Sequence, residues 1–314
     1  MILAKKLDGL HPFEYEHLFD AKALDSLQGT PGLDTVVRQY NKHAIERLMK
    51  IQYTGSHIRV TGENFPKLYR LLDQVCDTIN LPARPDLYIS WDYSINGFTV
   101  GVDHPIIVLN SGAIDLLSDD ELLYLIGHEI GHVKSRHALY HQMAQALPIL
   151  SNILGEATLG IGKLLSMPLQ LALFRWSRMS EFTADRAGLL ACQDPSVAAS
   201  VMMKWSGVPI RYYGDIKLKS FLEQARQFQS LDYESINKAF KILVVMNQTH
   251  PCSVMRAAEL MNWIESGEYQ RVVDRATSSR LHVREDGDRK SCRNCGRSLS
   301  GGEKFCTVCG AKLS

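Results

Sequence analysis

The chain has 314 residues, of which 45% are hydrophobic and 22% charged, so it can bury a sizeable core in one or two domains. Its 35 lysines and arginines balance 34 aspartates and glutamates, for a formal net charge of +1. This balance excludes a global field that would recruit nucleic acid or an acidic partner.

The first 60 residues predict a helical region that packs on the rest of the protein. QGTPGLD at 28–34 predicts a loop, and residues 35–51 carry apolar side chains at helical spacing. The start, MILAKKLDGLHPFEYE, has no apolar stretch followed by a small-residue cleavage site, so we expect no secretory signal. A cytoplasmic location is therefore expected.

Residues 61–273 predict the main domain, which is mainly helical with a small β-sheet and so of the α+β class. A helix is expected at 65–79 from its apolar spacing. Three short segments rich in β-branched or aromatic residues, bounded by Asp, Gly or Pro, predict strands. They lie at 87–90, 96–101 and 106–110. Several further helices are expected from Trp176 to about Glu268.

The next helix carries HEIGH at 128–132. It begins at a capping box, Ser118 to Glu121, and Pro148 predicts its end near Leu147. Residues i and i+4 of a helix project from nearly the same side, so the two histidines of the motif can hold one zinc ion. Two core histidines beside an unrelated glutamate are the alternative, which the complete motif disfavours.

The same expected helix carries three more titratable side chains whose position relative to the motif matters: Glu129, His137 and His141. Glu129 lies on the flank of the metal-binding face, where it can reach a water molecule on the metal without being a ligand. His137 and His141 are also four residues apart, but an uninterrupted helix turns them to the side opposite His128. We expect them on a solvated face.

A catalytic zinc needs a third protein ligand and an open position. SRMSEFTADRAGLLA at 177–191 offers Glu181 and Asp185, which are four residues apart on an expected helix. One carboxylate can bind the metal while the other accepts a hydrogen bond from a ligand histidine and sets its tautomer. The small residues 184, 187 and 188 suit close packing of two helices. An exposed acidic pair is the alternative.

Residues 147–174 are the most apolar part of the chain. A membrane-spanning helix needs about 20 nearly uninterrupted apolar residues, whereas Glu156, Lys163 and several glycines and prolines interrupt this segment. A buried or membrane-touching helical hairpin is favoured over a transmembrane pair. The protein is therefore expected to be peripheral at a membrane if it contacts one, rather than integral.

The C-terminal part predicts a second metal site. Residues 274–291 are polar and charged and predict a linker. Residues 292–314 resemble a small zinc ribbon, because two C-x2-C pairs suit a closed tetrahedral zinc that would supply most of the folding free energy. The cysteines are Cys292, Cys295, Cys306 and Cys309. Two disulfides are the alternative, disfavoured in a reducing compartment. We expect this ribbon to dock a protein partner or substrate.

The chain resembles the gluzincin endopeptidases of the family that contains the bacterial heat-shock protease HtpX and the eukaryotic CAAX prenyl protease. The resemblance covers roughly residues 10–270. It lies in HEIGH, in Glu181-x-x-x-Asp185, in Thr249-His250-Pro251 followed by Arg256, in Asn96-Gly97-Phe98, and in IIVLNSGAIDLLSDDEL. Asn96-Gly97-Phe98 differs from the usual Asn-Ala-Phe of the family by its glycine.

The resemblance implies a zinc metalloendopeptidase, with one catalytic zinc besides the structural zinc of the ribbon. It implies His128, His132 and Glu181 as zinc ligands, and Glu129 as the base. Asp185 would support a ligand, and Arg256 would pair with buried carboxylates. His250 would stabilise the oxyanion or cap the zinc. The strand around 96–101, with Asn96, Gly97 and Phe98, would be an edge that pairs with extended substrate.

Three functions follow from these features. Protein or peptide hydrolysis in quality control is the favoured one. A chaperone or adaptor that retains the scaffold without proteolysis is the main alternative, with the edge strand and the ribbon as interaction surfaces. An integral membrane quality-control protease is the third. An intact Glu129 disfavours the adaptor, because a pure binding protein needs no base beside a metal.

Overall fold

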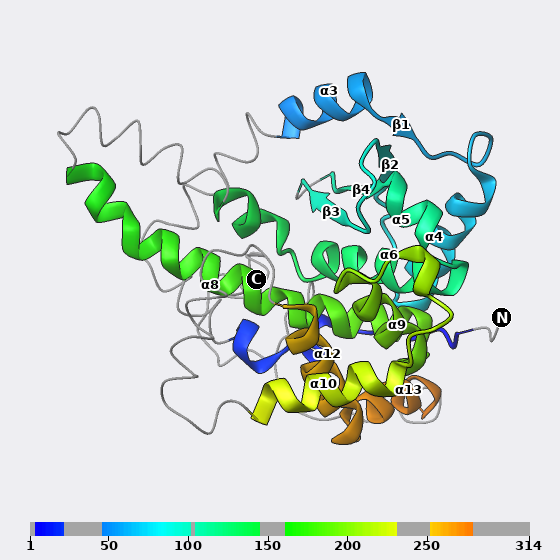
Figure 1. Ribbon diagram of the computed structural model, residues 1–314. Coiled ribbons are helices and arrows are strands. Elements are labelled where there is room, and N and C mark those ends of the chain that lie inside the picture. Colours follow the sequence, from blue (N-terminus) through cyan, green and yellow to red (C-terminus); the bar gives the residue numbers. More distant parts are fainter. Residues whose placement is uncertain (1–3, 22–45, 102–103, 145–160, 231–251, 279–314) are drawn as a thin grey trace, which may run out of the picture.

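The computed structural model describes residues 4–21, 46–101, 104–144, 161–230 and 252–278. Within them the chain is mainly helical, with four short strands in one sheet (Figure 1). The expected α+β class is confirmed. Of the expected features, residues 22–45 of the N-terminal region, residues 279–291 of the linker and the ribbon lie outside the described residues. The expected linker begins too early, because residues 274–278 are helical.

The sheet is small and mixed. Its strands are β1 (Ile58–Arg59), β2 (Asp86–Ser90), β3 (Gly97–Val100) and β4 (Ile106–Asn110), in the order β1-β2-β4-β3. β2 and β4 run parallel, while β1 and β3 are antiparallel to their neighbours. All five residues of β4 are buried, as an apolar run with no alternation predicts. Because β3 comes last in this order, it lies at one edge of the sheet among the described strands.

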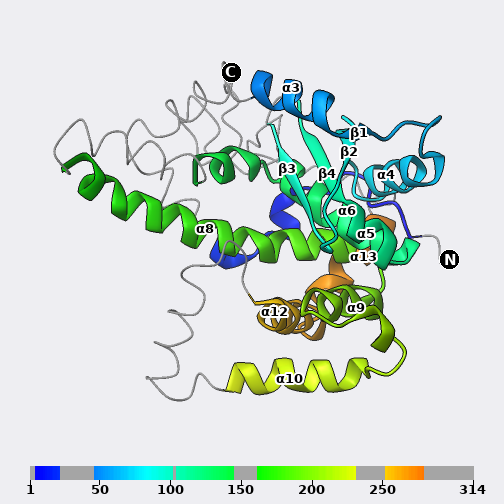
Figure 2. The ribbon, with the colours of Figure 1, turned by 45° about the horizontal axis from the view of Figure 1, so that its top comes forward.

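Helices make up most of the rest of the described chain. The segments before β4 are η1 (Pro12–Glu14), α3 (Glu46–Ser56) and α4 (Pro66–Thr78). Those after it are α5 (Ser111–Leu116), α6 (Asp119–Lys134), α8 (Ile161–Cys192), α9 (Pro195–Trp205), η3 (Ile210–Tyr212), α10 (Leu218–Ser230), α12 (Ser253–Glu265) and α13 (Glu268–Ser278). In both ribbon views α8 runs between the sheet and the layer of α9, α10 and α12 (Figures 1 and 2).

The central contact of the fold joins α6 to α8. A Cβ atom at Gly127 would lie 2.3 Å from the Cβ of Ala191, and one at Gly131 would lie 2.6 Å from the Cβ of Ala187. A Cβ atom at Gly188 of α8 would lie 2.9 Å from the Tyr124 ring of α6. The small side chains expected to let two helices meet therefore do so on both partners.

Helix α6 begins as expected and ends early. Ser118 and Glu121 form the predicted capping box, but the helix stops at Lys134 rather than near Leu147. The reason is a Schellman motif: the His137 N–H donates to the His132 carbonyl, and the Arg136 N–H donates to the Val133 carbonyl. Arg136 takes the left-handed position, with φ of 56°, that glycine usually occupies. A new helical segment starts at residue 138.

The expected hairpin at 147–174 is only partly described. Residues 147–160 lie outside the described residues, and residues 161–174 form the first half of α8. No turn separates them from the half of α8 that carries Glu181. Among the described helices, none combines the length and apolar character that crossing a bilayer requires.

The α6–α8 contact predicts that Gly127→Ala destabilises the fold. Alanine favours a helix over glycine by about 1 kcal/mol, but its methyl group would overlap Ala191, and overpacking costs about 1–3 kcal/mol. We expect urea denaturation to show a net loss of stability that Ala191→Gly partly reverses. Gly55→Ala, with no atom within 4 Å of the new Cβ, is the control. An equal effect of both alanines would contradict this packing.

Candidate metal centre

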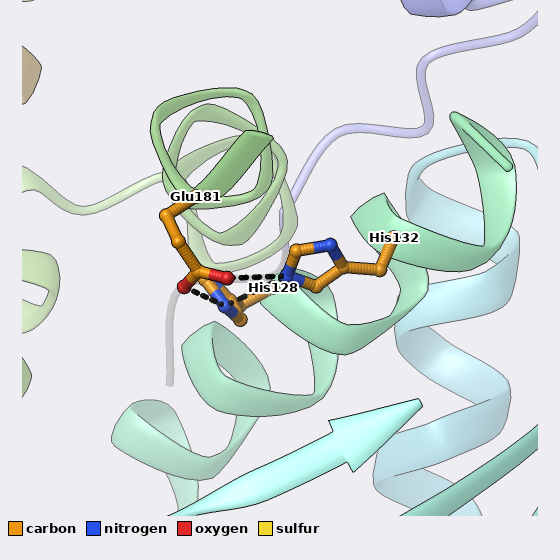
Figure 3. Close-up of side chains that lie close together, drawn as sticks. All are labelled: His128, His132 and Glu181. Carbon is orange, nitrogen blue, oxygen red and sulfur yellow. Dashed lines mark hydrogen bonds and ion pairs between the residues drawn. The ribbon is translucent and has the colours of Figure 1, made fainter. Parts of the chain in front are cut away.

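Three side chains from two helices converge in the interior. His128 and His132 lie one turn apart on α6, and Glu181 reaches them from α8 (Figure 3). The two Nε2 atoms are 3.2 Å apart, and each lies 3.4 Å from one oxygen of the Glu181 carboxylate. All three side chains are buried, and one ligand atom from each lies within 4.8 Å of the others. This spacing suits a metal ion.

The hydrogen bonds of His128 show that the site fits a cation. Asp185 Oδ1 lies 3.1 Å from His128 Nδ1. Burial opposes ionisation of Asp185, but the Arg256 guanidinium outweighs it and lowers the Asp185 pKa to about 2. An ionised carboxylate only accepts hydrogen bonds, so Nδ1 of His128 carries the proton. The lone pair of Nε2 then points at His132 and Glu181, where a zinc ion suits two imidazoles and a carboxylate.

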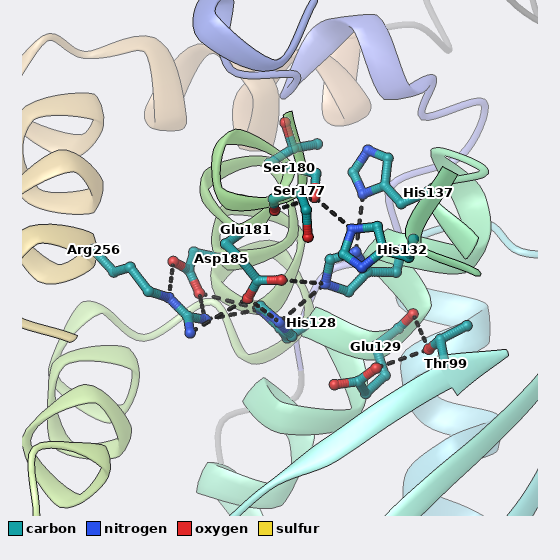
Figure 4. Close-up of polar contacts among 12 residues, drawn as sticks. Thr99, His128, Glu129, His132, His137, Ser177, Ser180, Glu181, Asp185 and Arg256 are labelled. Atoms are coloured by element: carbon teal, nitrogen blue, oxygen red, sulfur yellow. Dashed lines mark hydrogen bonds and ion pairs between the residues drawn. The ribbon is translucent and has the colours of Figure 1, made fainter. Parts of the chain in front are cut away.

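Arg256 of α12 neutralises the carboxylates of the centre. Its Nε donates to Asp185 Oδ2 at 2.8 Å, and its Nη1 lies 3.4 Å from Glu181 Oε2 (Figure 4). The guanidinium also stacks 4.4 Å above the Trp205 ring. Arg256 is therefore placed where the sequence predicts it, beside buried carboxylates.

Glu129 stands next to the three converging side chains. The Thr99 hydroxyl of β3 donates to Glu129 Oε2 at 2.8 Å and to the Glu129 carbonyl at 3.1 Å (Figure 4). Burial raises the pKa of Glu129 to about 7, although the charge of His128 and the Thr99 hydroxyl oppose the rise. A carboxylate with a pKa near neutrality can both accept and return a proton at physiological pH.

These side chains line a cleft of about 490 Å³. The edge strand forms one wall, with residues 96–100 lining the cleft, while Trp205 and Arg256 line it elsewhere. The structure thus brings Asn96, Gly97 and Phe98 to the same cavity as His128 and Glu129.

The expectation that His137 and His141 lie on a solvated face is wrong. His137 is buried, and its Nδ1 lies 2.9 Å from Nδ1 of His132. His141 is half-buried and its Nε2 lies 2.8 Å from the Ser180 hydroxyl. The expectation assumed one uninterrupted helix, whereas the chain turns after Lys134 and so brings both rings back toward the centre.

Two residues near the site carried no signal that identified them in the sequence. Thr99 is an ordinary strand residue until the sheet places it against Glu129. Asp20 lies far away along the chain, yet its Oδ2 is 3.1 Å from His137 Nε2. The remaining predicted site residues lie outside the described residues. They are His250, Cys292, Cys295, Cys306 and Cys309.

Comparisons with known proteins agree with this geometry. The model of peptidase family M48 matches residues 63–264, and that of a zinc-ribbon domain matches residues 291–313. The chain is 31% identical over 278 residues to the plastoglobule-localized metallopeptidase 48 of Arabidopsis thaliana, which covers 88% of this chain and 78% of that protein. It is 25% identical over 244 residues to the protease HtpX homolog of Ralstonia pickettii, with 71% of this chain and 82% of that protein covered.

The buried charges predict a large effect of Arg256→Leu. Without the guanidinium, Asp185 and Glu181 remain buried and lose the arginine that pairs with both of them, and breaking a buried ion pair costs about 3–5 kcal/mol. We expect urea denaturation in EDTA to show this loss. Arg226→Leu is the control, because Arg226 pairs with Glu265 on the surface, with side chains 68% and 56% exposed, and such pairs contribute at most about 1 kcal/mol. Equal losses would contradict the assigned role.

Proposed function

Because the chain belongs to peptidase family M48 and is an HtpX-like zinc metallopeptidase with a zinc-ribbon domain, we propose that it hydrolyses internal peptide bonds. His128, His132 and Glu181 hold the catalytic zinc, and Glu129 is the general base. The convergence of two Nε2 atoms and a carboxylate beside Glu129 is the observation that carries this proposal.

The chemistry divides between the metal and the chain. A zinc ion held in this way supplies Lewis acidity, which acidifies water toward neutral pH and polarises a carbonyl group. Glu129 takes a proton from the attacking water and passes it to the leaving amine. Asp185 keeps the proton of His128 on Nδ1, so that Nε2 is available as a ligand. His250 stabilises the oxyanion or caps the zinc.

The cleft indicates how a peptide substrate binds. An extended chain can add to the exposed edge of a sheet through backbone hydrogen bonds. β3 presents such an edge next to Glu129, and residues 96–98 lie within the cleft. We propose that this strand aligns the scissile peptide of a protein or peptide substrate.

We also propose a role in protein quality control, which the resemblance to the family of the heat-shock protease HtpX implies. We place this activity in the cytoplasm, at a membrane surface if residues 147–174 contact one. The four cysteines of residues 292–314 bind a structural zinc and present a docking surface for a protein partner, which the zinc-ribbon match supports.

The base assignment predicts that Glu129→Gln retains zinc and loses turnover. Glutamine is close to glutamate in size but cannot accept the proton, and general-base catalysis contributes about 10²–10⁴-fold. Casein cleavage measures turnover and elemental analysis measures zinc. His128→Ala is the control that loses the catalytic zinc while the ribbon keeps its own. Cleavage at the wild-type rate by Glu129→Gln would contradict the mechanism. A wild-type protein that leaves casein intact in zinc would favour the adaptor.

The two-site assignment predicts the metal content of a truncated chain. Purified full-length protein is expected to contain two zinc ions, and a chain without residues 292–314 is expected to contain one. Replacing the four cysteines of the ribbon by serine should have the same effect as the truncation, because serine does not supply thiolate ligands. Elemental analysis that finds equal zinc content in all three proteins would contradict the ribbon site.

A further inference from the structure

A chain of contacts continues from His132 into the protein interior. Nδ1 of His132 lies 2.9 Å from Nδ1 of His137, on the side of the ring away from Glu181 (Figure 4). Nε2 of His137 in turn lies 3.1 Å from Asp20 Oδ2, an electrostatic contact without the alignment of a hydrogen bond. Asp20 and His137 are both buried, with 0% and 1% of their surface exposed.

The protons on this chain determine whether His132 can bind a metal. Two neutral imidazoles that meet through their Nδ1 atoms share one proton, so one ring donates and the other accepts. If His137 donates, His132 must carry its own proton on Nε2, and that atom cannot bind zinc. If His132 donates, its Nε2 lone pair is available. The Asp20 carboxylate favours the second arrangement, because it attracts the His137 proton to Nε2 and leaves Nδ1 as the acceptor.

The backbone places His137 for this contact. In the Schellman motif that ends α6, His132 is the third residue from the end and His137 is the second residue beyond the cap. Side chains at these two positions commonly touch one another. The turn at Arg136 therefore brings the His137 ring to the His132 ring, and the five-residue separation follows from the motif.

The N-terminal segment, residues 4–21, places Asp20. The Thr183 hydroxyl of α8 donates to Asp20 Oδ2 at 2.6 Å. Arg186 Nη1, also on α8, donates to the Glu16 carbonyl at 3.1 Å. Tyr15 forms a hydrogen bond of 3.3 Å with Ser135 beside the end of α6. The segment is thus attached to both helices of the metal centre, although it lies outside residues 63–264, which the family model matches.

We propose that Asp20 and His137 are positioning residues that hold His132 in its metal-binding tautomer. The N-terminal segment, which supplies Asp20, then contributes to metal binding. This inference rests on the proposed function, in which His132 is a zinc ligand. Asp20 and His137 then do for His132 what Asp185 does for His128. Each ligand imidazole has a carboxylate behind it, directly in one case and through a second imidazole in the other.

The zinc affinity of the full-length chain tests this proposal, measured by competition with a fluorescent chelator. His128→Ala defines the signal from zinc bound elsewhere. His137→Leu removes the acceptor and is expected to weaken binding about 10–100-fold, as loss of a partner behind a metal ligand does. His137→Asn should bind close to the wild-type value, because its amide oxygen takes the place of Nδ1 as acceptor. His17→Asn, at a buried histidine of the N-terminal segment, is the matched control and should not change the affinity.

A double-mutant cycle separates this role from a structural one. Asp20→Asn should weaken zinc binding about 10-fold in the presence of His137, because an amide can also turn its NH2 group toward Nε2 and support the wrong tautomer. In the His137→Asn background the same change should have no effect, since an amide oxygen accepts whatever lies behind it. A merely structural Asp20 would give equal losses in both backgrounds.

Two results would overturn the proposal: wild-type zinc affinity for His137→Leu, or equal effects of Asp20→Asn in both backgrounds. Equal zinc binding by the wild type and His128→Ala would instead overturn the metal site itself, and this proposal with it. Unfolding midpoints in EDTA show whether any variant has lost its fold. If His137→Leu has lost its fold, the double-mutant cycle at Asp20 decides alone, because its variants retain a polar group at both positions.

Discussion

Two imidazole nitrogens face each other 3.2 Å apart inside the protein, with a carboxylate against both. Lone pairs this close repel unless a cation or a proton lies between them. Burial strengthens this repulsion, because an apolar surrounding screens charge poorly. Burial lowers the pKa of His132 to about 4, whereas the carboxylates around His128 raise its pKa to about 9 against the effect of burial. The metal-free site therefore holds its proton on His128, and a metal ion displaces it.

The rest of the architecture serves this convergence. Glu181 reaches the histidines from a helix that packs closely on α6 across glycine and alanine, and a larger residue at Gly127 or Gly131 would overlap Ala191 or Ala187. Arg256 enters from α12 and offsets the two carboxylates of α8. The edge strand β3 lines the cleft beside Glu129. Helix packing, buried charge and access for substrate are thus properties of one arrangement.

Periodicity within one element made much of the site predictable. His128 and His132, and likewise Glu181 and Asp185, share a helix face because they are four residues apart, and the strands at 87–90, 96–101 and 106–110 follow local composition. The end of α6 was not predictable in this way, because Arg136 adopts a left-handed conformation with no glycine to mark it. Asp20 was missed for a different reason: its contact with His137 depends on tertiary packing, and no local pattern encodes it. The hairpin expected at 147–174 stays a prediction, because only its second half, which belongs to α8, lies among the described residues.

The most direct test of this account is a crystal structure of the zinc-loaded Glu129→Gln protein with anomalous diffraction at the zinc edge. We expect a peak about 2.0–2.2 Å from Nε2 of His128, Nε2 of His132 and an oxygen of Glu181, the distances typical of zinc. Nδ1 of each histidine should keep its contact with Asp185 or His137. A zinc-loaded crystal with no peak between these three side chains, or with Glu181 turned away from the metal, would contradict the central claim.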